Sequence, residues 1–395
     1  MILRDVTLVD GGEAHRGAVA VDTESGTITA VGDADDVTAA ADGPAVSLPG
    51  YSVLPGLVDA HIHYSLSGER SVEDVVGMTD AELALAEARN ARKTLEAGIT
   101  GVRAMGARDV DPHVRDAIEA GDIPGPRTVA NCRSITITGG HGHHLGREIT
   151  GPNDARRAVR EQTKRGAEFI KFMTTGGVTT PGTDPDAVAM TYAEIDALVD
   201  EAHRQGVHAA THVHGAEGAK AAIRAGVDTV EHGTFLDDEA VELFLEHDVT
   251  LVPTLSAPYY IVRNMEMATE ESARKTRHVY ERHIQSFEKA LDAGVRIAGG
   301  TDAGTPFNYH GANASEVEFM ANYGMAPAEA IRAMTETAAA VVGLDGSGTL
   351  EAGTYADLLL VEGDVTDDLT LLNNPTAVLK GGEVVAGAVP GASDE

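Results

Sequence analysis

Cysteine is nearly absent from this sequence of 395 residues, and its scarcity excludes two kinds of structure. The single cysteine, Cys132, cannot form a disulfide within the chain, and it cannot build a metal site from several thiolates. Long apolar runs are missing too, because no stretch of about 18 uncharged apolar residues occurs. The first residues alternate like a strand and show no basic end before an apolar run. We therefore expect a soluble cytoplasmic protein with no membrane partner.

Basic residues are also few, with 30 lysines and arginines against 62 acidic residues and a net charge of -32. Only 7 of the 30 are lysines. A chain this acidic repels phosphate groups, so nucleic acid is not an expected partner. The acidic residues are scattered rather than gathered in one tail, which is typical of halophilic proteins, whose self-repulsion is screened by salt. An acidic protein from a mesophile is the alternative.

Short β-type runs separated by turn residues occupy both ends of the chain, residues 1–55 and 346–395. We expect the two ends to pair into one small β-sandwich domain. Gly381 and Gly382 mark a hairpin turn in the second end. The predicted strands are 2–8, 18–21, 27–31, 45–48, 349–350, 356–361, 377–380 and 383–386.

The middle of the chain, residues 56–345, alternates β-type runs with stretches of helical apolar spacing. Eight such units predict an α/β fold, a (β/α)₈ TIM barrel, whose chemistry lies at the carboxyl ends of the strands. The predicted strands are 57–61, 100–105, 128–132, 169–173, 208–212, 229–232, 250–254 and 296–300. The clearest predicted helices are 80–97, 153–165, 192–205, 216–225 and 239–246.

Polar residues with metal-binding chemistry lie on these strands or at their ends. His61 and His63 are two residues apart, so they point to the same side of a strand and can bind one ion. Lys171 lies in an otherwise apolar strand, where an unpaired ammonium group would be costly. The fifth, sixth and eighth strands end near further candidates: His212, His232 and Asp302.

The order of these residues, HxH, Lys, His, His and Asp, resembles the binuclear branch of the amidohydrolase superfamily over nearly the whole chain. By that resemblance His61, His63 and Asp302 would bind the more buried of two divalent ions. His212 and His232 would bind the more exposed one. Imidazole and carboxylate ligands suit zinc best, with manganese, cobalt or nickel as alternatives.

The resemblance also implies that Lys171 carries a carbamate formed with CO₂, and that this carbamate bridges both ions. A protonated amine is no ligand, whereas the two cations offset the charge of a carbamate. The cations would lower the pKa of a bridging water so that hydroxide exists at neutral pH. Asp302 would be the proton shuttle to the leaving amine. We expect a metal-dependent hydrolase of an amide, peptide-like or cyclic amide bond.

The resemblance is strongest to imidazolonepropionase-related amidohydrolases and to metal-dependent dipeptidases that cleave before proline, arginine or lysine. Their GGHG histidine contacts substrate, which assigns His141 a catalytic and substrate-binding role. His214 and Tyr259 are further candidates for substrate binding. The alternatives are a histidine that supports a metal ligand or faces solvent, and a tyrosine packed in a loop. The proline-specific enzymes carry tyrosine at the place of His214, which puts proline specificity in doubt. Solvated positions are expected for His143, His144, His247, His278 and His283.

The expected substrate is a small molecule, a dipeptide or an N-acyl amino acid. One alternative is a mononuclear enzyme similar to imidazolonepropionase or a deaminase, which would have no need of Lys171. Another is a non-catalytic binding barrel, which would lack metal ligands, and none is missing here. Relatives often form closed assemblies, so the resemblance also implies a homo-oligomer.

Overall fold

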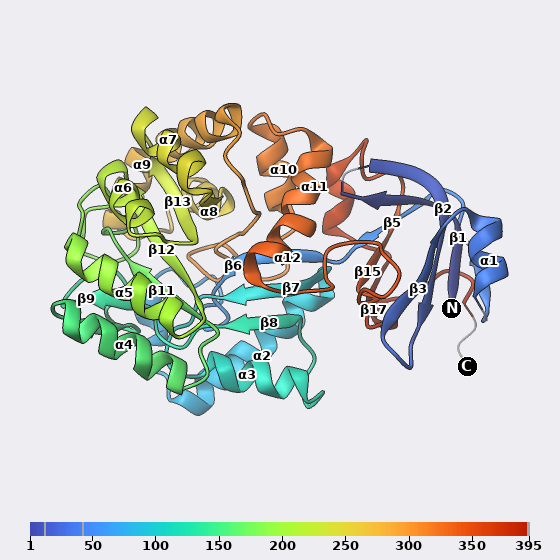
Figure 1. The fold of residues 1–395 in the computed structure, drawn as a ribbon, viewed down its shortest axis with the longest axis horizontal. Coiled ribbons are helices and arrows are strands. Elements are labelled where there is room, and N and C mark those ends of the chain that lie inside the picture. The colour runs from blue at the N-terminus through green and yellow to red at the C-terminus, as the bar shows by residue number, and fades with distance from the viewer. Residues whose placement is uncertain (12, 42, 393–395) are drawn as a thin grey trace.

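The computed structural model describes residues 1–11, 13–41 and 43–392, and it shows a mixed α/β protein with two unequal parts (Figure 1). The smaller part, at the right of Figure 1, contains strands from both chain ends and the short helix α1 (Ala34–Ala40). The larger part contains parallel strands surrounded by helices. Helix α1 was not predicted from the sequence, and it begins where the Asp33 side chain accepts a hydrogen bond from the backbone of Asp35.

One sheet unites the two chain ends, and its order is β17, β16, β15, β5, β1, β2 and β3, with β4 paired to β1. Strand β5 connects the ends, because it pairs in parallel with β1 and antiparallel with β15. The predicted pair 349–350 lies in a bend and its flank instead of a strand. The strand bounds are β1 (Ile2–Asp10), β2 (Glu13–Asp22), β3 (Thr27–Gly32), β4 (Ala45–Ser47), β5 (Tyr51–Pro55), β15 (Leu358–Glu362), β16 (Ala377–Lys380) and β17 (Glu383–Gly387).

The larger part contains two parallel sheets, one in the order β6, β7, β8 and one in the order β10, β9, β11, β12, β13, β14. Seven of these strands fall where the sequence pattern predicts them, while β9 and β10 are short additions that it did not predict. The bounds are β6 (Leu57–Ile62), β7 (Ile99–Ala104), β8 (Arg127–Ala130), β9 (Ile135–Ile137), β10 (Arg147–Ile149), β11 (Phe169–Met173), β12 (His208–Gly215), β13 (Thr229–Phe235) and β14 (Thr250–Val252).

The predicted eighth strand, 296–300, is not a continuous strand. The segment makes single parallel bridges instead, from Ile297 to Leu251 and from Ala303 to Ile62. It therefore lies between β14 of one parallel sheet and β6 of the other. The two sheets are connected through this segment even though it lacks regular pairing.

Two glycines of this segment pack closely against neighbouring side chains. A Cβ atom on Gly299 would lie 2.2 Å from the Met334 sulfur, and one on Gly300 would lie 2.6 Å from Val252. Asp302 adopts a φ of 59°, in the left-handed region that non-glycine residues rarely occupy. The backbone turns here, between the bridge at Ile297 and the bridge at Ala303.

Helices follow most of the parallel strands, and the five clearest predicted helices are present with ends shifted by one residue. Capping boxes start α2 at Thr79 and Glu82 and α5 at Thr191 and Glu194, each cap contributing about 1 kcal/mol. Among the described residues, none of these helices is both long and apolar enough to span a bilayer. The bounds are α2 (Asp80–Glu96), α3 (Asp111–Glu119), α4 (Pro152–Lys164), α5 (Tyr192–Arg204), α6 (Ala216–Arg224), α7 (Asp238–His247), α8 (Ser256–Arg263), α9 (Glu270–Ala293), α10 (Ser315–Asn322), α11 (Pro327–Ala333) and α12 (Glu336–Val342).

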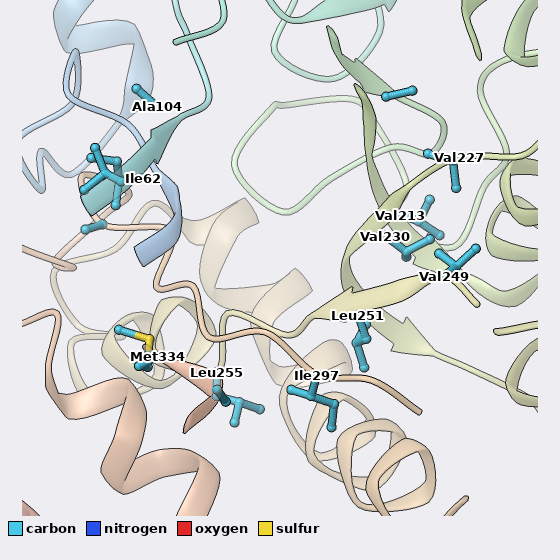
Figure 2. Close-up of a cluster of buried hydrophobic side chains, with 14 of the residues drawn as sticks. Ile62, Ala104, Val213, Val227, Val230, Val249, Leu251, Leu255, Ile297 and Met334 are labelled. Carbon is cyan, nitrogen blue, oxygen red and sulfur yellow. The ribbon is translucent and has the colours of Figure 1, made fainter. Parts of the chain in front are cut away.

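A single apolar cluster extends across both parallel sheets (Figure 2). It includes Ile62 from β6, Val213 from β12, Val230 from β13 and Leu251 from β14, together with Ile297 from the irregular segment. Full burial of one such side chain contributes about 1.5 to 3 kcal/mol. This shared core fixes the ends of the strands relative to one another, and the candidate site lies at those ends.

Candidate metal centre

Most of the predicted site residues converge on one cavity at the carboxyl ends of the parallel strands. His61 is the penultimate residue of β6 and Lys171 lies in the middle of β11, and parallel strands carry such residues toward one face. The predicted residues that line this cavity are His61, His63, His141, Lys171, His212, His214, His232 and Asp302.

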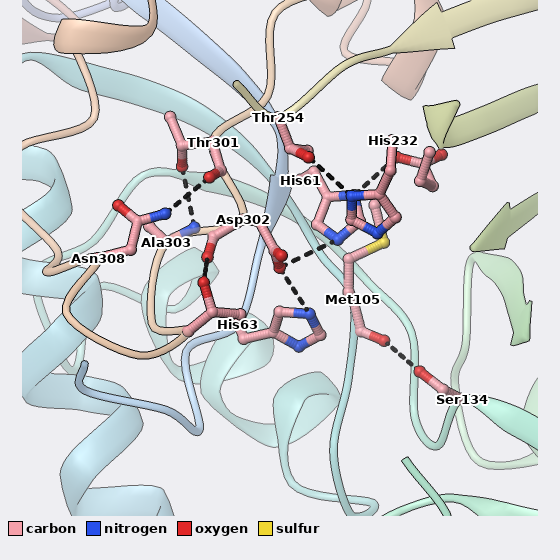
Figure 3. Close-up of polar contacts among 12 residues, drawn as sticks. His61, His63, Met105, Ser134, His232, Thr254, Thr301, Asp302, Ala303 and Asn308 are labelled. Atoms are coloured by element: carbon pink, nitrogen blue, oxygen red, sulfur yellow. Dashed lines mark hydrogen bonds and ion pairs between the residues drawn. The ribbon is translucent and has the colours of Figure 1, made fainter. Parts of the chain in front are cut away.

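Unusual backbone conformations lie at this site. His232, Thr254 and Asp302 have φ values of 71°, 55° and 59°, although none of them is glycine. Each such residue costs about 1 to 3 kcal/mol unless its surroundings hold it in place. The hydrogen bond of 2.7 Å between His232 Nδ1 and Thr254 Oγ1 joins two of them (Figure 3). Strain of this kind concentrates at functional sites, which is consistent with a site here.

His61, His63 and Asp302 form a compact group of potential metal ligands (Figure 3). Their ligating atoms all lie within 4.8 Å of one another. Asp302 Oδ1 is 3.4 Å from His61 Nε2 and 3.2 Å from His63 Nε2, yet it makes no hydrogen bond to any described residue. Burial would raise the pKa of Asp302, but His61 and His63 hold it well below its usual value. This ionised donor set fits a divalent cation.

Hydrogen bonds fix the orientation of three imidazole rings. In each ring one nitrogen bonds to an oxygen, which leaves the other nitrogen available for a cation. Burial also lowers the pKa values of His212 and His232 well below 6.5, so these rings are in the neutral form that binds metals. The three bonds join His61 Nδ1 to Glu231 Oε2 at 2.7 Å, His232 Nδ1 to Thr254 Oγ1 at 2.7 Å, and His212 Nε2 to Gly176 O at 3.0 Å.

The Lys171 ammonium is buried without a hydrogen-bond partner among the described residues. Burial lowers its pKa to about 8, although Glu231 and Asp302 act in the opposite direction. Buried polar groups nearly always have partners, so an orphan donor at this place requires an explanation. A lysine whose amine is easily deprotonated is suited to carboxylation, and the negative charge of a carbamate would suit the cations that the neighbouring ligands fit.

His141 and His214 lie beside the candidate ligands. The His141 ring centroid is 4.4 Å from that of His212, and its Nδ1 is 2.8 Å from Thr180 Oγ1. The His214 ring centroid is 4.6 Å from that of His212. Tyr259 is not brought into the group, because its ring packs on Phe319 at a centroid distance of 4.5 Å and it is not one of the described residues that line the cavity. Its role in substrate binding stays a prediction.

His283 lies in the cavity wall, so the expectation that it is a plain surface residue is wrong. Only 3% of it is exposed, and its Nε2 donates a hydrogen bond to the backbone oxygen of His232 at 3.0 Å. The physical reason is the packing of α9 on β13. Val279, Phe287 and Ala290 share the buried face of α9, and their spacing would have placed His283 on it.

Sequence reasoning also missed two buried charged residues, Arg103 and Glu231. Arg103 is 1% exposed and Glu231 is fully buried, and Arg103 Nη2 donates to Glu231 Oε1 at 2.8 Å. Burial raises the pKa of Glu231, but Arg103 and His61 lower it to about 2. An arginine in the apolar strand 99–104 gives the same sequence signal as Lys171 and could have been found in that way.

Comparison with known proteins identifies relatives across almost the whole chain. Residues 52–391 match the model of the amidohydrolase family. Ochratoxinase from Aspergillus niger is 31% identical over 369 residues, which cover 85% of this chain and 76% of that protein. Imidazolonepropionase from Halobacterium salinarum is 27% identical over 413 residues, which cover 95% of this chain and 93% of that protein.

Solved structures agree with the sequence comparison. The crystal structure of A. niger ochratoxinase matches with a TM-score of 0.89 and 28% identity, covering 99% of this chain and 96% of that one. An Xaa-Pro dipeptidase with methionine bound in its active site matches with a TM-score of 0.87 and 31% identity. The match covers 97% of this chain and 98% of that one. The chain therefore belongs to the amidohydrolase family, and it is a hydrolase that acts on carbon–nitrogen bonds.

Proposed function

We propose that this protein hydrolyses the amide bond of N-acyl amino acids at a binuclear metal centre. The observation that carries the proposed substrate is the charge of the cavity wall. Apart from the histidines, Lys171 and Asp302 are the only ionisable side chains among the described residues that line it. The remaining wall is largely apolar, and it includes Leu66, Val178 and Ile261.

This wall disfavours a free dipeptide. The α-ammonium group of a dipeptide would lose its hydration and find no carboxylate partner besides Asp302, which is costly for a buried charge. An acylated amine carries no charge, and an apolar acyl group suits the wall. Dipeptides are the second candidate, supported by the similarity to an Xaa-Pro dipeptidase structure.

The residues present would bind two divalent ions, zinc best, with manganese, cobalt or nickel as alternatives. The first ion would take His61, His63 and Asp302, and the second would take His212 and His232. The carbamate of Lys171 would bridge them. Bound divalent cations supply two effects, a lowered pKa of water and a polarised substrate carbonyl.

Asp302 accepts the proton of the attacking water and passes it to the leaving nitrogen, which then departs as a neutral amine. His141 stabilises the substrate oxygen. Thr180 Oγ1 accepts a hydrogen bond from Gly142 N at 3.0 Å, and its own proton is then available for His141 Nδ1 at 2.8 Å. In that tautomer His141 Nε2 carries a proton and donates it in a hydrogen bond to the substrate.

The alternative is a mononuclear enzyme similar to imidazolonepropionase or a deaminase. It is supported by the compact group His61, His63 and Asp302, which would bind one ion alone. It leaves the buried and unpartnered Lys171 ammonium unexplained, so we favour the binuclear centre. A non-catalytic barrel explains neither feature.

The fold is consistent with this assignment. We infer that the two parallel sheets and the segment 296–303 form one closed (β/α)₈ barrel within residues 56–345. Residues 1–55 and 346–395 then form a β-sandwich domain beside it. The bridges at Ile297 and Ala303 support the closure.

Hydrolysis of matched substrate pairs tests the proposal. N-acetyl-methionine and glycyl-methionine differ mainly in the charge at the acyl end, and both release methionine, which can be measured directly. The expected result is a kcat/KM at least about tenfold higher for the N-acetyl compound, since each 1.4 kcal/mol is a factor of ten. Equal or preferred cleavage of the dipeptide would contradict the proposed substrate class.

A further inference from the structure

A buried ion pair lies beneath the candidate metal ligands, and the proposed chemistry does not use it. Arg103 in β7 and Glu231 in β13 are 1% and 0% exposed, respectively. Their 2.8 Å contact joins strands of two different sheets. Taking both charges out of water is costly, so such a pair is poor evidence for stability and requires another explanation.

The contacts of Glu231 hold its carboxylate in one orientation. Oε1 accepts hydrogen bonds from Arg103 Nη2 at 2.8 Å and from Thr229 Oγ1 at 2.6 Å. Oε2 faces His61 Nδ1 at 2.7 Å. Because a carboxylate only accepts hydrogen bonds, His61 must carry its proton on Nδ1. The lone pair of His61 then lies on Nε2, which faces Asp302 at 3.4 Å.

Arg103 extends this support to the backbone. Its Nε donates to the carbonyl oxygen of Ala60 at 2.8 Å, one residue before His61, and its Nη1 donates to Thr229 Oγ1 at 3.1 Å. One guanidinium group therefore holds the backbone beside the histidine, the carboxylate that orients the ring, and the threonine that orients the carboxylate.

We propose that Glu231 and Arg103 are positioning residues for the more buried metal site, with Glu231 fixing the tautomer and ring orientation of His61 and Arg103 fixing Glu231. This inference rests on the proposed function, because it concerns the binding of a divalent ion. Neither residue contacts substrate in this account.

Replacement of Glu231 by glutamine should show the effect. If the glutamine oxygen faces His61, the glutamine NH₂ group faces the donors of Arg103 and Thr229. If the amide is flipped, the NH₂ group faces the N–H of His61. Either orientation opposes donor to donor. Outer partners of metal-binding histidines typically account for a 10- to 100-fold change in metal affinity, and we expect E231Q to lose about that much affinity for zinc.

A matched control exists at a distance from the site. Glu201 is 2% exposed and pairs with Arg160 at 2.7 Å and 2.9 Å, so E201Q also removes a buried carboxylate from an arginine. We expect E201Q to bind zinc like the wild-type protein. The milder T229V variant removes one hydroxyl group with little change in volume, and it should weaken zinc binding several-fold even if E231Q fails to fold.

The measurement is competition for zinc between each folded protein and a chelator of known affinity, with thermal unfolding of the metal-free proteins beside it. Weaker zinc binding in E231Q and T229V, beyond that of an equally destabilised E201Q, would support the inference. Wild-type affinity in both site variants would overturn it and leave the proposed function intact. Absence of tight binding of zinc, manganese, cobalt and nickel in the wild-type protein would instead overturn both.

Discussion

His141 shows how a single side chain obtains a role from its immediate surroundings. Three histidines occur close together in the loop 139–146, and the sequence leaves open which of them faces the substrate. The structure places His141 beside the His212 ring, and His143 Nδ1 donates instead to Gly140 O at 2.9 Å. The His141 ring packs against Gly177, and only glycine fits there because a Cβ atom would lie 2.4 Å from the ring.

Replacement of His141 by alanine should therefore lower kcat/KM for an N-acyl amino acid by about 10²- to 10³-fold, the usual loss when one donor to a developing oxyanion is removed. Metal content should stay the same, because His141 is not among the proposed ligands. Steady-state kinetics and elemental analysis of the same preparation give both numbers. The matched variant H143A should stay within about twofold of wild type, and an equal loss in H143A would contradict this assignment.

At the scale of elements, a buried lysine of α9 holds the loop between β11 and α5. Lys275 is 4% exposed, and its Nζ donates to the backbone oxygens of Gly177 at 3.1 Å and Thr180 at 2.7 Å. Glu271, one helical turn earlier, pairs with Lys275 at 3.1 Å and accepts from Gly182 N at 2.9 Å. The loop forms one wall of the cavity, so α9 positions that wall.

Loss of this contact should affect substrate binding more than chemistry. We expect K275M to raise KM by about tenfold or more, because the two carbonyls lose a charged donor worth about 1.5 to 3 kcal/mol, while kcat changes less. The exposed neighbour Arg274 provides the control, since R274M should leave both constants near wild type. A K275M variant with unchanged KM would show that the loop is held in another way.

The regular elements could be predicted from the sequence because their signals are local. The ends of α2 and α5 were predicted within one residue from the apolar spacing, and the structure adds capping boxes at Thr79 and Thr191. The irregular segment 296–303 could not be read in this way. Gly299 and Gly300 pack closely against Met334 and Val252, and a local sequence pattern does not report contacts between residues distant in sequence.

The site was predictable to the extent that its residues follow strands in a recognisable order. His61, Lys171 and Asp302 stand out in that order, and the structure brings them to one cavity. Arg103 could have been found as a charged residue in an apolar strand, as Lys171 was, but its pairing with Glu231 depends on a contact between two sheets that the sequence does not show. The metal-binding roles themselves stay predictions, since a cluster of side chains does not identify its ion.

The whole molecule carries a net charge of -32, and this charge should make its stability depend on salt. Repulsion among surface carboxylates acts over about 10 Å at 0.1 M salt but only about 3 Å at 1 M. We expect the unfolding temperature to rise between 0.1 M and 3 M KCl, as halophilic adaptation predicts. Sucrose, which stabilises without screening charge, is the control. An unfolding temperature that does not change with KCl would favour the alternative of an acidic mesophilic protein.

The most direct test of the binuclear centre is metal content per chain, measured by elemental analysis on protein prepared in high salt, for the wild-type chain and for K171A. We expect two divalent ions per wild-type chain and one or fewer in K171A, with loss of N-acyl-amino-acid hydrolysis. One ion in both proteins would contradict the binuclear centre, because the wild-type chain would then hold a mononuclear site to which Lys171 contributes nothing.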